Sequence, residues 1–190
     1  MLLKKIVVYV IIILIIYYVL LHLSYRKTTN QYKYLDLNND ALTSYNFESQ
    51  FSYKLPIIIW NNDTNINIDR TLYDTSPSFT IKKHTVHNFV NDNLLSYHDV
   101  DRLFVIAKQS VTIELYIPKI SKQCKYIGVL NHKHIYNYKL NNNQINNIEI
   151  QLEPNDILYI PRYWLFNISE KKVDLVMYST IFSLLSTFQL

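Results

Sequence analysis

The sequence predicts a mainly β fold, a sandwich or a barrel, preceded by one transmembrane helix and followed by a short C-terminal helix. Three observations support this prediction. Short apolar runs separated by turn-forming residues fill the chain after Leu55, as in all-β sandwiches and barrels. Residues 6–23 are almost entirely apolar. The total of 190 residues suits one domain with an appendage, since a domain takes roughly 100–200 residues.

The first expected element is a helical anchor from Ile6 to Leu23, in which His22 is the only strongly polar residue. A helix of this length nearly matches a hydrocarbon core of about 30 Å, so we expect a single pass through a lipid bilayer as an uncleaved signal-anchor. A cleaved signal peptide is the alternative, but the apolar run exceeds the usual length of about 7–15 residues and no small-residue cleavage site follows it. The orientation stays open, because two bases flank each end. These bases are Lys4, Lys5, Arg26 and Lys27.

The excess of basic charge lies at this anchor. The sequence holds 19 Lys and Arg against 15 Asp and Glu, and four of the bases but none of the acids lie in the first 27 residues. The remaining 15 bases balance the 15 acids. Because nucleic-acid binding depends on clustered bases that neutralise phosphates, we exclude nucleic acid as a partner.

The scarcity of glycine and cysteine excludes several kinds of site. Gly128 is the single glycine, whereas P-loops, dinucleotide-binding turns and nucleophile elbows need two or more. Cys124 is the single cysteine, which excludes an intrachain disulfide and a C-x-x-C metal or redox pair. We interpret Cys124 as an inert, buried or half-buried thiol, although a free thiol can also join two chains.

Residues 28–54 are polar and aperiodic, and we interpret them as a stalk or lead-in to a domain at residues 55–190. The clearest strand signal is at residues 111–117, where apolar and polar residues alternate with a period of two. The expected strands are 56–60, 78–82, 103–107, 111–117, 126–130, 134–140, 147–152, 157–160, 165–169 and 173–178.

Two helices are expected beside these strands. The first is a short helix over Val86–Tyr97 with Thr85 as its N-cap. The second is an amphipathic helix at the C-terminus, where apolar residues at i, i+3, i+4 and i+7 share one face. Its apolar residues are Ile181, Leu184, Leu185 and Phe188.

The segment 152–168 carries the most specific pattern, L-E-P-N-D-I-L-Y-I-P-R-Y-W-L-F-N-I. It resembles the closing strand-turn-strand signature of cupin-like Jumonji-C (JmjC) proteins, which reads roughly L-x-P-G-D-x-L-Y-I-P-x-x-W-x-H-x-V. Asn155 stands at the usual glycine position, and Trp164 is expected to plug the wall of the barrel. Upstream, residues 103–118 look like the earlier hairpin of the same family.

The resemblance implies a double-stranded β-helix, a cupin-like barrel that holds Fe(II) through an H-x-D pair and a later histidine, with 2-oxoglutarate as co-substrate. A ferrous site of this kind needs two His and one carboxylate. Here Phe166 occupies the later His position, and the H-x-D position falls on Ser96-Tyr97-His98. We therefore expect no metal, no cofactor and no catalytic residue, and we interpret Ser96, His98, Tyr163 and Phe166 as vestigial pocket positions.

Other residues of metal-binding type are interpreted more simply. Trp164 is expected in the core. The remaining histidines are expected to be solvated or buried, and two aspartates are expected in loops or caps. These residues are His84, His87, His132, His134, Asp99 and Asp101. Two glycosylation sequons, at Asn62 and Asn167, are expected by chance in so Asn-rich a chain.

Together these observations predict a single-pass membrane protein that displays a cupin-like domain with a degenerate iron site. Its expected role is that of a pseudoenzyme, a non-catalytic binding or structural module whose protein partner the sequence does not define. A membrane-tethered Fe(II)/2-oxoglutarate-dependent oxygenase of the hydroxylase or demethylase class, with displaced ligands, is the enzymatic alternative. A structural envelope or surface protein is a second alternative. Fold resemblance does not decide among them, because function depends on the site.

Overall fold

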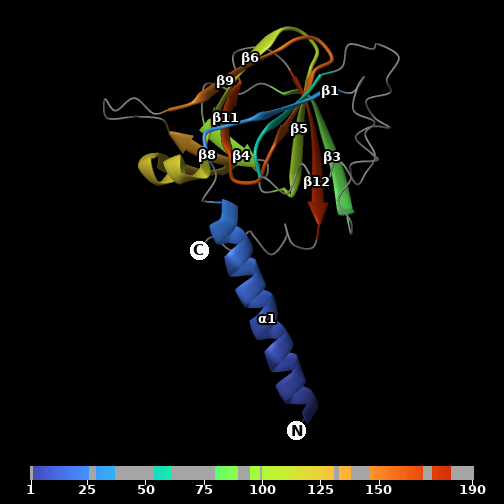
Figure 1. Ribbon diagram of the computed structural model, residues 1–190, viewed down its shortest axis with the longest axis vertical. Coiled ribbons are helices and arrows are strands. Elements are labelled where there is room, and N and C mark those ends of the chain that lie inside the picture. The colour runs from blue at the N-terminus through green and yellow to red at the C-terminus, as the bar shows by residue number, and fades with distance from the viewer. Residues whose placement is uncertain are drawn as a thin grey trace.

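The computed structural model describes residues 2–25, 29–36, 54–60, 80–89, 95–98, 100–130, 133–137, 146–168 and 173–180. These residues form one N-terminal helix, α1 (Leu2–Tyr25), two six-stranded sheets and a short 3-10 helix, η1 (Pro118–Gln123). The two sheets lie face to face, and α1 projects from one end of the sandwich (Figure 1). The predicted C-terminal helix at residues 181–188 lies outside the described residues.

The first sheet, sheet A, contains central strands that are buried on both faces. Parallel pairing joins β1 to β2, and antiparallel pairing joins the other neighbours. In spatial order it contains β1 (Lys33–Asp36), β2 (Ile57–Trp60), β10 (Ile157–Ile160), β5 (Arg102–Ala107), β12 (Val173–Thr180) and β3 (Thr80–Phe89).

The second sheet, sheet B, is antiparallel throughout. In spatial order it contains β7 (Lys125–Leu130), β8 (Lys133–Asn137), β4 (Leu95–His98), β11 (Leu165–Ile168), β6 (Val111–Tyr116) and β9 (Ile148–Leu152).

The core lies between the two sheets. Its largest cluster joins Val105 and Leu175 of sheet A to Ile113 and Phe166 of sheet B. The alternation predicted at residues 111–117 explains this arrangement, because Val111, Ile113 and Leu115 point into the core while Thr112 and Glu114 are half-buried on the other face. A second cluster, which includes Phe104 and Tyr178, covers the outer face of sheet A.

Eight of the strands wind between the sheets in the order β3, β4, β5, β6, β9, β10, β11 and β12, and each step changes sheet except the one from β6 to β9, which pair with each other. The resulting strand orders, β10-β5-β12-β3 and β9-β6-β11-β4, are those of a double-sheet jelly roll. The prediction of a closed cupin-like barrel, the double-stranded β-helix, is corrected: all strand pairs in the described part of the chain lie within one sheet or the other. The sheets stay open because β1 and β2 extend sheet A, while β7 and β8 extend sheet B.

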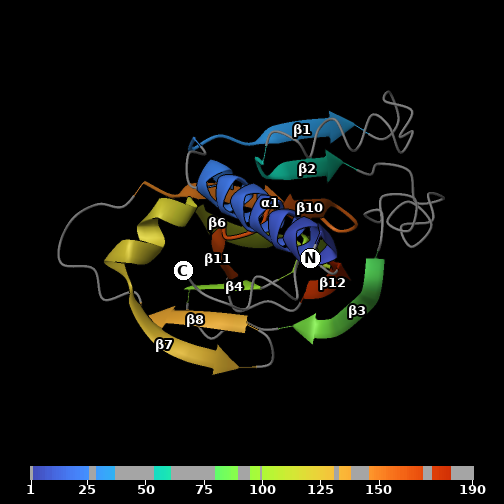
Figure 2. The ribbon, with the colours of Figure 1, turned by 90° about the horizontal axis from the view of Figure 1, so that it is seen from below.

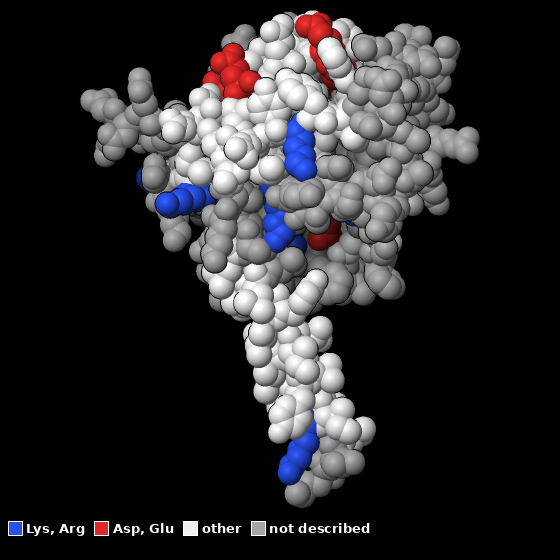
Figure 3. Space-filling model, viewed as in Figure 1, with Lys and Arg blue, Asp and Glu red and all other residues white. Residues whose placement is uncertain are grey.

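The prediction of a single-pass membrane anchor at Ile6–Leu23, and of a membrane localisation, is also corrected. Within the described residues, no helix combines the length and apolarity that a bilayer crossing requires. Figure 3 shows the shaft of α1 without charge except near its N-terminal end.

The helix predicted over Val86–Tyr97 is wrong, since this region contains the end of β3 and all of β4 but its last residue. Thr85 is an exposed strand residue paired with Val176 and does not cap a helix. The segment predicted as a stalk at residues 28–54 contributes the strand β1. The pairing of β3 with β12 and of β1 with β2 determines the secondary structure of these segments, and local propensity does not.

The turn between β9 and β10 confirms the interpretation of Asn155. This residue has φ of 76°, a left-handed conformation that glycine usually supplies and that asparagine tolerates. The backbone N–H of Asn155 donates to the carbonyl of Ala107 at 2.8 Å, and Asp156 Oδ2 accepts from the N–H of Glu153 at 2.8 Å. The turn thereby ties the β9–β10 connection to the end of β5.

Candidate functional site

Three of the four vestigial pocket positions meet inside the sandwich. Ser96 of β4 pairs directly with Phe166 of β11 across the ladder of sheet B. Paired residues share a face, and Phe166 belongs to the core between the sheets, so Ser96 faces the same interior. His98 follows on the same face of β4. All three residues are buried.

Aromatic packing defines this interior cluster of Ser96, His98 and Phe166. The imidazole of His98 stacks on the ring of Phe166, with centroids 5.8 Å apart and an angle of 12° between the planes. The ring of Phe89 meets the imidazole edge to face at 6.0 Å. His98 is therefore held between two phenyl rings, in the manner of a core aromatic residue.

The donor set of the interior cluster does not fit a ferrous site. A site of the two-His, one-carboxylate class needs three nitrogen or oxygen ligands, whereas these positions offer one hydroxyl, one imidazole and one phenyl ring. A phenyl ring has no lone pair to donate to a metal. No group of three or more His, Cys, Asp or Glu residues converges on one point in the described part of the chain.

Tyr163, the fourth vestigial position, does not join the interior cluster. It packs with Leu95, Leu165 and Ile120 on the opposite face of sheet B. The guanidinium of Arg162 lies 5.1 Å from the centre of the Tyr163 ring. The backbone of Tyr163 has φ of 67°, so the turn before β11 directs the side chain outward.

Asp101 has a structural role at the end of sheet A, as its interpretation as a capping residue predicts. Its Oδ2 accepts the backbone N–H of Thr180 at 2.6 Å, and its Oδ1 lies 3.6 Å from a terminal nitrogen of Arg162. The side chain of Arg162 is almost fully buried. These contacts fasten the turn before β5 and the turn before β11 to the last residue of β12.

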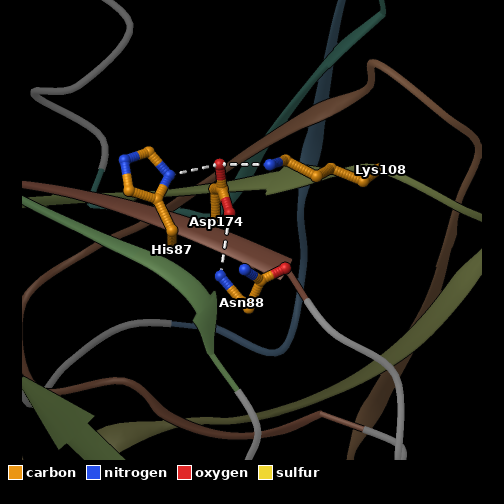
Figure 4. A network of polar contacts seen from close by, with 4 residues as sticks. All are labelled: His87, Asn88, Lys108 and Asp174. Atoms are coloured by element: carbon orange, nitrogen blue, oxygen red, sulfur yellow. Dashed lines mark hydrogen bonds and ion pairs between the residues drawn. The ribbon is translucent and has the colours of Figure 1, made fainter.

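A second polar group, centred on Asp174, was not found from the sequence. One carboxylate oxygen of Asp174 lies 2.8 Å from His87 Nδ1 and 2.9 Å from Lys108 Nζ, while the other accepts the backbone N–H of Asn88 at 3.0 Å. Figure 4 shows the carboxylate between these three partners. The carboxylate is 9% exposed, whereas the side chains of His87 and Lys108 are 65% and 54% exposed.

The Asp174 network occupies a β-bulge at the edge of sheet A. Two residues of β3, His87 and Asn88, oppose the single residue Asp174 of β12, since Phe89 pairs with Val173 and Val86 with Leu175. Asn88 has φ of 52°, which is typical of the irregular backbone of bulges. The carboxylate therefore accepts the N–H that the bulge removes from the ladder.

The partners of Asp174 determine its protonation. Burial alone raises the pKa of the carboxyl, but the hydrogen bonds from Lys108, His87 and the Asn88 N–H, with the charge of Lys108, outweigh it and hold the pKa below its usual value. Chemically, a carboxylate that binds one imidazole nitrogen orients the ring and leaves its other nitrogen toward solvent. No nucleophile or further metal ligand joins this group among the contacts of the described residues.

The remaining candidates that the structure describes belong to neither group. His84 is exposed on β3 opposite Met177, and His134 lies on β8 opposite Tyr97. His132 and Asp99 fall outside the described residues, as does the sequon at Asn62. The sequon residue Asn167 is half-buried in a central strand, and its amide donates to Glu114 at 3.4 Å.

Cys124 is half-buried after η1, as expected. Burial raises the pKa of its thiol, which lowers the fraction of reactive thiolate.

No protein-family model and no curated protein sequence matches the chain.

Proposed function

We propose that this protein is a non-catalytic binding or structural module built on a jelly-roll domain. The single observation that carries the proposal is the stacking of His98 on Phe166, opposite Ser96, at the positions where the resembled family holds iron. The cluster is buried, closely packed and poor in metal ligands. Such a cluster contributes to the stability of the core, since stacked aromatic pairs add about 0.5–1.5 kcal/mol beyond their buried area.

The proposal is tested by thermal unfolding of the full chain with Fe(II), Mn(II) or Ni(II), with and without 2-oxoglutarate. A ligand that binds only the folded state raises stability by RT ln(1 + [L]/Kd). We expect the melting temperature to stay unchanged with each metal. A rise that the His98→Ala variant abolishes would overturn the proposal in favour of the oxygenase.

A rebuilt variant makes the same test sharper. The triple substitution Ser96→His, His98→Asp and Phe166→His places the H-x-D pair and the later histidine at the matched positions. We expect metal to stabilise this variant and not the wild-type chain, because the geometry of a facial triad would then be restored. If the folded variant gains no metal-dependent stability, the correspondence of these positions with the resembled family is wrong.

A further inference from the structure

Sheet A extends beyond the sheet that faces it. The four jelly-roll strands of sheet A end at β10. Beyond β10, the sheet continues with β2 and then β1. Figure 2 shows β1 and β2 side by side at one edge of the molecule. Ile58 of β2 still reaches the core between the sheets, whereas β1 contributes no residue to it. Among the described residues, no strand of sheet B therefore covers this face of sheet A along β1.

Three aromatic residues occupy this uncovered face. The parallel register pairs Tyr34 with Ile58 and Asp36 with Trp60, so Tyr34 and Trp60 lie on the face of Ile58. Tyr32 precedes Tyr34 by two residues and its ring contacts that of Tyr34. The exposed fractions are 36% for Tyr32, 68% for Tyr34 and 49% for Trp60. We call these three residues the aromatic strip.

The two tyrosines of the aromatic strip hold each other in place. Their ring centroids are 5.2 Å apart with an angle of 70° between the planes, and their hydroxyls share a hydrogen bond of 3.2 Å. That hydrogen bond is the main reason why the pKa of the Tyr34 hydroxyl is raised above its usual value. The strip thus presents two adjacent aromatic rings, each with a hydroxyl at its edge.

The size of the aromatic strip suits a small ligand. About half of three aromatic side chains is exposed, on the order of 300 Å², whereas a stable protein interface takes about 800 Å² from each partner. Alternate residues of a strand are about 6.7 Å apart and neighbouring strands about 4.8 Å apart, so the strip is long and narrow. Lys33 is the only basic residue of β1 and β2, and it alternates onto the opposite face, which argues against an anionic ligand.

We propose that the aromatic strip of Tyr32, Tyr34 and Trp60 binds a short neutral oligosaccharide. The C–H groups on the face of a sugar ring complement the negative face of an aromatic ring. The sugar hydroxyls complement the tyrosine hydroxyls, which both donate and accept hydrogen bonds. An extended chain of sugar rings matches a row of aromatic residues along a strand edge. This site lies outside the interior cluster and does not depend on it.

Tryptophan fluorescence of the full chain provides the test. The chain has two tryptophans, and Trp164 is buried while Trp60 is half-exposed, so a sugar stacked on the strip changes the emission of Trp60. The probes are hexasaccharides of β-1,4-glucose, α-1,4-glucose, β-1,4-N-acetylglucosamine and α-1,6-mannose. We expect at least one to give a saturable change below about 10 mM. Tyr34→Ala should weaken that binding about tenfold, and Tyr34→Phe, which keeps the ring, should weaken it less.

Tyr126→Ala is the matched control, since Tyr126 is similarly exposed at 42% but lies on β7 of the other sheet. It should leave sugar binding unchanged, and unchanged melting temperatures should show that all variants fold. The proposal is overturned if none of the four hexasaccharides binds, or if Tyr34→Ala and Tyr126→Ala have the same effect. It is also overturned if Tyr34→Ala changes the oligomeric state in size-exclusion chromatography, because the strip would then be a protein interface.

Discussion

Trp164 is the largest fully buried side chain, and it closes the turn before β11 against the start of the domain. Its indole N–H donates to the backbone carbonyl of Lys54 at 3.2 Å. Trp164→Ala should lower the free energy of unfolding by about 3–5 kcal/mol, because it leaves a large cavity in the core. Denaturant unfolding measures this loss. Trp60→Ala, at a half-exposed site, should cost less than about 0.5 kcal/mol. Equal midpoints for the two variants would contradict the packing of Trp164.

Individual residues differ in how well the sequence predicts their place. The family resemblance assigns Phe166 to the later histidine position and Ser96 and His98 to the earlier H-x-D position, and the structure pairs Ser96 with Phe166 directly. Tyr163 does not join them in the structure: it follows a turn with positive φ, and its side chain packs on the other face of sheet B. The sequence gives no sign of the Asp174 network. Asp174 is one polar residue within an apolar run, and its partners His87 and Asn88 lie 87 and 86 residues away in the chain.

At the scale of elements, β3 illustrates why the sequence predicts regular strands well and strands with a bulge poorly. Strands such as β10 (Ile157–Ile160) coincide with their predicted bounds because a continuous apolar run between turn residues is a local signal. In β3 the bulge at His87 and Asn88 interrupts the alternation of residues between the two faces of the strand. The sequence pattern of a strand is therefore lost there, and the sequence predicts a helix. The pairing of β3 with β12, which involves residues far apart in sequence, supplies the missing information.

The bulge of β3 also carries a prediction about pH. The pKa of Asp174 is lower in the folded state than in the unfolded state, so the unfolded chain binds more protons as the pH falls. The stabilisation is therefore complete above the unfolded pKa of about 3.9 and is lost as the pH falls through the lower, folded value. Asp174→Asn should cost about 1.5–3 kcal/mol at pH 7, the range for hydrogen bonds to charged groups. The difference in free energy of unfolding between wild type and Asp174→Asn should become smaller as the pH falls toward 3.

Urea unfolding of both chains at pH 7 and pH 3 checks this prediction. Lys108→Met is the control, because the Lys108 side chain is more than half exposed and its ion pair should contribute less than about 1 kcal/mol. A difference between wild type and Asp174→Asn that stays constant from pH 7 to pH 3 would show that the charge of Asp174 does not stabilise the bulge.

At the scale of the whole molecule, the winding of the chain between two sheets makes the central strand pairs long-range in sequence. Strand pairs such as β12 with β5 and β11 with β6 bring together residues distant in sequence, so each sheet is completed only when the last strands arrive. The sequence predicted most of these strands but not the openness of the sheets, since edge extension by β1 and by the β7–β8 hairpin depends on pairing and not on local pattern.

The helix α1 stands apart from this core, and the last prediction concerns its removal. None of the three apolar clusters of the described residues includes a residue of α1, and its side chains from Leu3 to Tyr17 are all exposed. Deleting residues 1–27 should therefore change the free energy of unfolding by less than about 0.5 kcal/mol, as expected for changes away from packed features. Contiguous exposed apolar surface promotes association, so the shortened chain should also elute as a smaller species than the full chain. Thermal unfolding and size-exclusion chromatography measure the two effects. A clearly lower melting temperature for the shortened chain would show that α1 packs on the sandwich and belongs to its core.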